Sequence, residues 1–122
     1  MENVIVVSMR KGADPAPEGY TPIRIDRKNP VLGNPYVMKG NSLEERKQVV
    51  RNFRLDANES RENSTDLWKG IEKLADRVEN GEKLALQCWC APLDCHGDVI
   101  KSAISYILKT RRHPAQESSP GL

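Results

Sequence analysis

A short, uninterrupted apolar run near the start of the chain restricts the fold more than any other feature. Residues 3–8 read Asn-Val-Ile-Val-Val-Ser, and the four central residues are all apolar and β-branched. A strand with one exposed face alternates apolar and polar residues, whereas a continuous run is typical of a strand buried on both faces. We therefore expect a parallel sheet covered by helices.

Two further strands are predicted from similar patterns. Residues 20–25 form a short or edge strand, because Pro22 cannot donate a hydrogen bond within a sheet. Residues 83–90 (Lys-Leu-Ala-Leu-Gln-Cys-Trp-Cys) form the last strand. The first and last of these strands are separated by helical patterns, which favours a parallel arrangement.

Three helices are expected, over about residues 43–55, 64–80 and 95–110. Ser42 and Glu45 form a capping-box pattern at the start of the first, and Asn80-Gly81 is typical of the end of the second. The polar stretch 56–63 reads as a solvated loop or a frayed helix end. The element order predicts an α/β fold, a small Rossmann-like domain of two or three layers with a short, mostly parallel sheet. Residues 1–110 are expected to form this single domain, followed by a polar, disordered tail over 111–122.

Composition narrows the functional classes. The formal net charge of +2 is too close to balance to indicate nucleic-acid binding by itself. The apolar run at the N-terminus lacks the features of a signal peptide, and no stretch is long enough to span a bilayer, so no membrane partner is expected. The chain has three cysteines, which do not suggest a disulfide framework. A reducing, cytoplasmic location is therefore expected.

The segment Cys88-Trp89-Cys90-Ala91-Pro92-Leu93-Asp94-Cys95-His96-Gly97 is the most informative one. It follows a predicted strand and opens a predicted helix, and ligands of α/β sheets bind at the carboxyl ends of strands. A thiol at a helix start tends to have a lowered pKa, so Cys95 or Cys90 is a candidate nucleophile. His96 is a candidate acid or base, and Gly97 leaves room for a ligand to approach the backbone.

Structural interpretations of the same residues remain open. Cys88 is more simply explained as a core residue, and Trp89 as a buried one. Cys88, Cys90, Cys95 and His96 supply atoms that zinc accepts, but their spacing does not fit the usual pairs separated by two to four residues. No metal and no cofactor is therefore predicted.

A second candidate cluster lies in the loop that follows the second strand. Arg10, Arg24 and Arg27 could converge on an anion, because guanidinium pairs well with phosphate or carboxylate. Gly33 and Asn34 lie between two prolines, where Asn34 either presents its amide to a ligand or braces a turn. The loop lacks the Gly-Lys-Ser/Thr ending of a P-loop.

Taken together, these elements resemble a family of small domains of unknown function in bacteriophages and bacteria. The resemblance rests on Arg10-Lys11, on Arg27 with Gly33-Asn34-Pro35-Tyr36, and on the run from Cys88 through His96-Gly97 to Ile100, and it spans about residues 4–108. It locates a site without implying a reaction, and it implies a location in the host cytoplasm if the protein is phage-encoded.

Two functions follow as hypotheses. The first is an enzyme or nucleotide-handling domain that binds a small phosphorylated or nucleotide-like ligand, with Cys90, Cys95 and His96 as catalytic residues. Its ligand contacts would be Arg10, Arg27, Gly33, Asn34 and Gly97. The alternative is a non-catalytic, phage-encoded module that docks on a host protein or nucleic acid, with a structural or metal-binding cysteine motif. An enzyme requires a pocket lined by the motif, and a docking module requires an exposed apolar or basic patch.

Overall fold

The computed structural model describes residues 3–9, 12, 16–26, 28–35, 42–89 and 95–112. In this part of the chain the sheet has three strands, β1 (Val4–Ser8), β2 (Tyr20–Arg24) and β3 (Lys83–Cys88). The strand order is β1-β3-β2, and both pairs are parallel, with Val6 and Ile23 on either side of Leu86. The predicted small α/β fold with a short parallel sheet is therefore confirmed.

The central position belongs to β3 and not to the first strand. Leu84, Ala85 and Leu86 have no exposed surface, whereas β1 is only half-buried after Val4. The expectation that residues 3–8 are buried on both faces was thus wrong for most of β1, because β1 is an edge strand. β2 forms the other edge, as Pro22 required.

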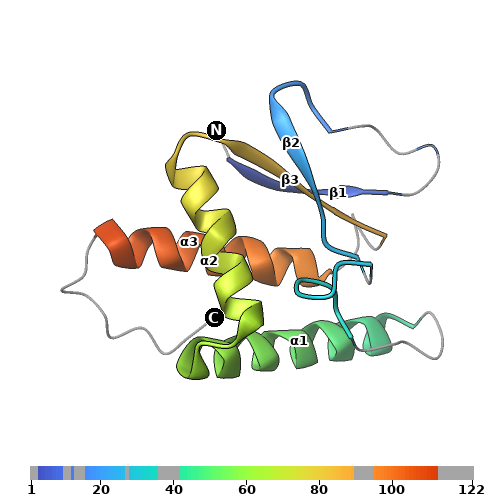
Figure 1. The fold of residues 1–122 in the computed structure, drawn as a ribbon. Helices are drawn as coiled ribbons and strands as arrows, with labels where there is room; N and C mark the ends of the chain where they lie inside the picture. The colour runs from blue at the N-terminus through green and yellow to red at the C-terminus, as the bar shows by residue number, and fades with distance from the viewer. Residues whose placement is uncertain are drawn as a thin grey trace.

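The helices are α1 (Leu43–Asn63), α2 (Asp66–Glu79) and α3 (His96–Arg112). In the view of Figure 1, α3 and α1 lie below the sheet, and α2 runs down from the level of β3 to α1. α3 contacts β1 and β3, and it also contacts α1 and α2. α2 also contacts β3 directly, so both α2 and α3 pack against the sheet. Apolar side chains from β3 and all three helices fill the core, among them Phe53, Ile71, Leu74, Leu86, Ile100 and Ile104.

The first helix is longer than its sequence pattern suggested. Residues 56–63 were expected to be a loop or a frayed end, but they continue α1 to Asn63. Ala57 and Ser60 are buried and extend the inward face of Phe53 at helical spacing, which holds this polar stretch in the helix. Ser60 Oγ then accepts a hydrogen bond from Trp68 N at 2.8 Å and also bonds Thr65 Oγ1, so it caps α2.

The predicted helix boundaries are otherwise close to those observed. Ser42 caps α1 by accepting a bond from Glu45 N at 3.1 Å. Gly81 follows α2 with a φ of 97°, a left-handed conformation that glycine adopts without steric cost. α3 extends to Arg112, so residues 111 and 112 belong to the helix and not to the expected tail, and residues 113–122 lie outside the described residues. None of the helices in the described ranges is both long and apolar enough to cross a membrane.

Candidate functional site at the carboxyl edge of the sheet

The candidate site lies where the three strands end. β1 ends at Ser8, which pairs with Cys88, and the residue after β2, Ile25, donates its N–H to Gln87 O at 3.0 Å. α3 begins at this same edge, with Cys95 immediately before it. The parallel strand directions required by the sequence prediction are thus confirmed.

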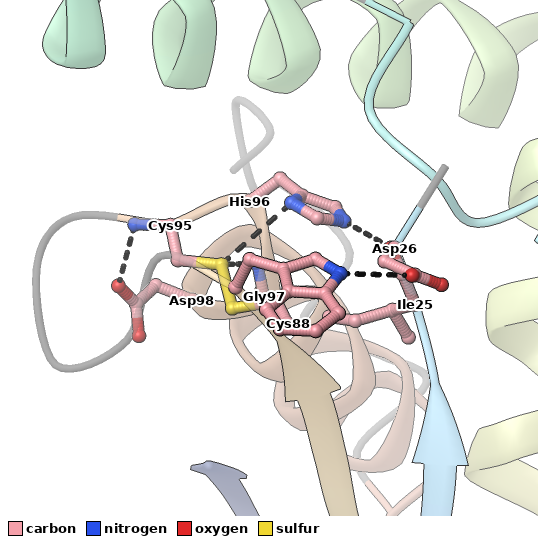
Figure 2. Close-up of a disulfide and its surroundings, with 8 residues drawn as sticks. Ile25, Asp26, Cys88, Cys95, His96, Gly97 and Asp98 are labelled. Carbon is pink, nitrogen blue, oxygen red and sulfur yellow. Dashed lines mark hydrogen bonds between the residues drawn. A yellow bond between two sulfur atoms is a disulfide. The ribbon is translucent and has the colours of Figure 1, made fainter. Parts of the chain in front are cut away.

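A disulfide bond joins Cys88 to Cys95 (Figure 2). It connects the last residue of β3 to the residue before α3, and each cysteine is only 1% exposed. The sequence did not suggest a disulfide framework, and the structure pairs two of the three cysteines because the strand end and the helix start bring these two thiols together. Cys88 is buried, as expected. Cys95 is not a free thiol in this structure, so its role as a nucleophile is restricted to the reduced protein.

His96 is held inside the protein by a short hydrogen bond. Its Nε2 lies 2.6 Å from the main-chain oxygen of Ile25, and its ring packs edge-on against Phe53 with centroids 5.0 Å apart. A carbonyl oxygen can only accept, so Nε2 carries the proton and Nδ1 of the neutral ring has a free lone pair. Nδ1 lies 3.7 Å from Cys95 Sγ. Burial lowers the pKa of His96, and the bond to Ile25 partly opposes this change.

Gly97 serves the packing of α3 against the sheet. A Cβ atom at this position would lie 3.0 Å from both Ile25 Cδ1 and Val6 Cγ1. Gly97 N also donates to Cys95 Sγ at 3.3 Å. The room that was expected for a ligand is therefore occupied by strand side chains, and the assignment of Gly97 as a ligand contact is corrected.

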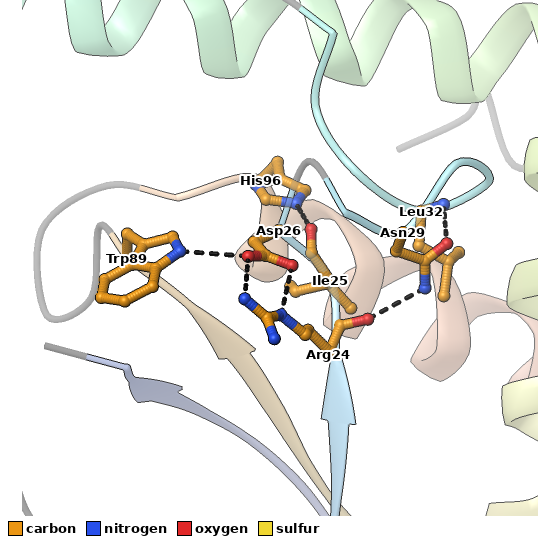
Figure 3. A network of polar contacts seen from close by, with 7 residues as sticks. All are labelled: Arg24, Ile25, Asp26, Asn29, Leu32, Trp89 and His96. Carbon is orange, nitrogen blue, oxygen red and sulfur yellow. Dashed lines mark hydrogen bonds and ion pairs between the residues drawn. The ribbon is translucent and has the colours of Figure 1, made fainter.

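A polar network on the same edge centres on Asp26 (Figure 3). Its carboxylate accepts bonds from Arg24 Nε at 2.8 Å, Arg24 Nη2 at 2.9 Å and Trp89 Nε1 at 3.1 Å. The bond from Arg24 is the main reason why the pKa of Asp26 falls to about 2. Asp26 was not among the predicted site residues, although an aspartate directly after a strand was a usable signal.

Trp89 is the most exposed large side chain of this network. It is 49% exposed and Asp26 is 7% exposed, so the indole N–H reaches inward while much of the ring faces solvent. The expectation of a buried Trp89 was wrong. The alternation of side chains along a strand places Trp89 on the face opposite to that of Cys88. At the end of β3, the described residues do not cover this face completely.

These contacts form a closed chain of links around the site. The disulfide connects Cys88 to Cys95, His96 Nε2 donates to the main-chain oxygen of Ile25, and Trp89 Nε1 donates to the carboxylate of Asp26. Each remaining step is one peptide bond along the chain. The orientation of the exposed Trp89 ring is therefore tied to the disulfide and to the start of α3.

The loop after β2 is braced from within. Asn29 Oδ1 accepts bonds from Val31 N and Leu32 N, both at 2.9 Å, and Gly33 N donates to Asn29 O at 3.0 Å. Asn34 Nδ2 donates to Val49 O at 3.2 Å, which fastens the loop to α1. Gly33 and Asn34 thus have structural contacts, and Asn34 takes the bracing role that was one of its two expected roles. Asn29 was missed at the sequence level.

Three predicted residues, Arg10, Arg27 and Cys90, lie outside the described residues. Among the residues that the structure does describe, no group of three potential ligands could hold a metal ion. The expectation that Cys90, Cys95 and His96 share one pocket therefore stays a prediction, and the structure shows only that Cys95 Sγ and His96 Nδ1 lie 3.7 Å apart. His96 is 6% exposed and does not point into bulk solvent.

A buried cation near the start of α1 was also missed. Arg46 is 6% exposed, and its Nη1 has no hydrogen-bond partner. Arginines at such positions of a helix are usually solvated, and the sequence pattern alone gave no indication of its burial.

The fold and the site define a small α/β domain with a cysteine–histidine cluster at the carboxyl edge of a parallel sheet. Residues 7–106 match the family described as Domain of unknown function (DUF4326), and the chain belongs to this family. Comparisons with curated proteins and with solved structures yield no match.

Proposed function

We propose that this protein binds a small phosphorylated or nucleotide-like ligand at the carboxyl edge of its sheet. The observation that carries the proposal is the half-exposed ring of Trp89, which is held by Asp26 beside the guanidinium of Arg24. The family match gives no activity, so the proposal rests on this geometry.

The aromatic ring suits the planar part of such a ligand. A tryptophan face stacks on any nucleobase, and each such contact contributes about 1–3 kcal/mol. Trp89 is suited to stacking because its N–H bond to Asp26 fixes the ring before a ligand arrives, which lowers the entropy lost on binding.

Arg24 supplies positive charge next to the ring. Its side chain is 43% exposed, and its bonds to Asp26 use Nε and Nη2, which leaves Nη1 outside the pair. Guanidinium groups bind phosphate oxygens through such donors. An aromatic face and a guanidinium side by side match the base and the phosphate of a nucleotide.

Catalysis belongs to the reduced protein in this proposal. Reduction frees the Cys95 thiol, and Nδ1 of His96 is positioned to accept its proton.

The docking alternative required an exposed apolar or basic patch. The exposed large apolar side chains of the described residues, Val31, Leu43, Leu55 and Trp89, come from separate places in three segments, so no observation favours that alternative.

Tryptophan fluorescence offers a direct test of ligand binding. The only other tryptophan, Trp68, is 6% exposed, so quenching by an added ligand reports mainly on Trp89. We expect AMP and ADP to quench the emission, and ribose 5-phosphate to bind at least about tenfold more weakly because it lacks a base. Calorimetry should give the same order of affinities.

Variants make the test specific. Trp89→Leu should weaken AMP binding by about 5- to 100-fold, whereas Trp89→Phe should retain most of it. Leu55→Ala is the matched control, because Leu55 is 60% exposed on α1, outside the site. Equal affinities of wild type and Trp89→Leu, or no binding of any nucleotide at millimolar concentration, would exclude the proposal.

A further inference from the structure

Three side-chain atoms of kinds that bind zinc meet where β3 ends and α3 begins (Figure 2). They are Sγ of Cys88, Sγ of Cys95 and Nδ1 of His96. The disulfide holds the two sulfurs together, and Nδ1 lies 3.7 Å from Cys95 Sγ. All three residues are buried. The end of the central strand and the start of α3 thus bring two sulfurs and one imidazole nitrogen into a single cluster.

The distance between Cys95 and His96 fits two ligands of one zinc ion. Zinc binds sulfur at about 2.3 Å and imidazole nitrogen at about 2.1 Å, in a tetrahedral arrangement. Two such ligands of the same ion are about 3.6 Å apart. The 3.7 Å between Cys95 Sγ and His96 Nδ1 is close to this value. The spacing along the chain argued against zinc, but in the folded protein the donor atoms of these adjacent residues converge.

The contacts around the cluster are those that usually surround metal ligands. A ligating histidine donates its second N–H to a carbonyl or a carboxylate, which fixes the ring. His96 Nε2 donates in this way to Ile25 O at 2.6 Å, and the lone pair of Nδ1 is left for another partner. Gly97 N donates to Cys95 Sγ at 3.3 Å, a bond that favours the thiolate. Both ligands therefore have supporting hydrogen bonds before an ion arrives.

The redox state decides whether these atoms can bind a metal. In the disulfide neither sulfur is a thiolate, and in that state no metal-binding group is present among the described residues. A dithiol reductant supplies two electrons and two protons, which gives two thiols and converts the reductant to its own disulfide. Binding of Zn²⁺ then releases the two thiol protons to solvent. A divalent ion with two thiolates and a neutral imidazole carries no net charge, which suits a buried position.

We propose that the reduced protein binds a zinc ion through Cys88, Cys95 and His96. Two thiolates and one imidazole are a ligand set that zinc accepts, and the fourth tetrahedral position is left to a water molecule. The inference does not rest on nucleotide binding at Trp89. It separates two reduced states of the protein. Without zinc, Cys95 can pass its proton to His96, and with zinc both atoms are coordinated and this transfer is blocked.

Titration with cobalt tests the site directly. The full chain is reduced with a phosphine, which avoids added thiols that bind metal, and is titrated with Co²⁺ in the absence of oxygen. We expect one Co²⁺ per chain, the visible absorption of a tetrahedral site and a near-ultraviolet band from thiolate-to-cobalt charge transfer. Zn²⁺ should displace Co²⁺ and remove both bands, because thiolate ligands select zinc. The native mass of the zinc complex should equal the chain plus zinc less two protons.

Variants identify the ligands. His96→Gln should weaken Co²⁺ binding by at least about 100-fold, because the loss of an outer contact alone costs 10- to 100-fold. Cys95→Ser should weaken binding as much and also reduce the charge-transfer band. Cys90→Ser is the matched control, because it removes the one cysteine that is not a proposed ligand, and it should keep the affinity and spectrum of the wild type.

Four results would overturn the inference. They are the absence of a tetrahedral spectrum in the reduced wild type, equal binding by the oxidised chain, wild-type affinity in His96→Gln, and loss of binding in Cys90→Ser. If a ligand variant does not fold, the spectrum and the native mass of the wild-type complex still decide, because both report the number of thiolates. AMP binding is measured separately on the metal-free protein, so a failure of the stacking proposal and a failure of the zinc site are distinguishable.

Discussion

The Nε2 atom of His96 lies 2.6 Å from the main-chain oxygen of Ile25, and this bond turns Nδ1 toward Cys95 Sγ, 3.7 Å away. The relationship assigns distinct tasks to the two ring nitrogens. Nε2 anchors the ring to the end of β2, and Nδ1 is the only one that can accept a proton from a reduced Cys95. The chemistry of the cluster therefore depends on whether the bond between Cys88 and Cys95 is intact.

The first prediction concerns the reactivity of the reduced protein. We expect Cys95 to be alkylated faster at pH 7 than either Cys88 or Cys90. The N–H of Gly97 and the start of α3 stabilise the thiolate, and His96 accepts the proton, whereas Cys88 is equally buried without these contacts. Labelling with iodoacetamide, resolved in time and read by peptide mass spectrometry, measures the three rates.

The variant His96→Gln serves as the control for this prediction. It should slow the labelling of Cys95, because the thiol loses the group that accepts its proton, and leave the labelling of the other cysteines unchanged. Labelling of Cys95 at the rate of Cys88 or slower would remove it as a nucleophile and support a purely structural disulfide.

The second prediction concerns the contribution of the disulfide to stability. The bond closes a short loop, because Cys88 and Cys95 are seven positions apart along the chain. Restriction of the unfolded chain by a loop of this size stabilises the native state by about 2 kcal/mol. We expect urea unfolding to shift by this amount when a dithiol reductant is added, and the double variant Cys88→Ala/Cys95→Ala to show no further shift with reductant. A shift of the same size in the double variant would contradict the disulfide.

The third prediction concerns Asp26 and acid. Its pKa falls from an ordinary value of 3.8 to about 2 in the folded protein, chiefly through Arg24. The folded state therefore binds this proton more weakly, so the stabilisation is complete above about pH 4 and is lost as the pH falls toward 2. The emission of Trp89 should change over the same range, because protonation weakens its bond to the carboxylate. In Asp26→Asn both the transition and the stabilisation should be absent, and an unchanged acid transition in that variant would contradict the assignment.

The fourth prediction concerns the buried imidazole. Burial lowers the pKa of His96 below its ordinary value of 6.5, so the unfolded state binds this proton more readily than the folded one. The free energy of unfolding should be constant above about pH 7 and fall as the pH decreases below 6.5. Urea unfolding at several values between pH 8 and 5 measures this slope. The variant His96→Gln should flatten this dependence of stability on pH. The free energy of unfolding of the variant should also be lower at every pH, because glutamine fills the space of the imidazole ring beside Phe53 less well.

Local patterns in the sequence were sufficient for the elements themselves. The β-branched run at 4–7, the cap at Ser42 and the stop at Gly81 each depend on neighbours within a few residues, and each is found where it was predicted. The same holds for the place of the cysteine–histidine motif at the carboxyl edge, which follows from a strand that runs into a helix. The prediction of a loop or a frayed helix end for residues 56–63 was wrong, because Ala57 and Ser60 are buried by contacts with other elements.

Contacts between distant segments were decided by the tertiary structure alone. The central place of β3 pairs Val4 with Leu84, which are 80 residues apart, and the bond between Asp26 and Trp89 joins residues 63 apart. The choice of Cys88 as the partner of Cys95 depends on the same placement of β3 beside the start of α3. The burial of Arg46 also depends on what packs over α1. Periodicity states which side of an element a residue occupies, but the strand order and the crossing of helices determine what that side meets. The sequence by itself therefore determined the elements and the edge at which the site lies, and the packing of those elements decided which side chains meet there.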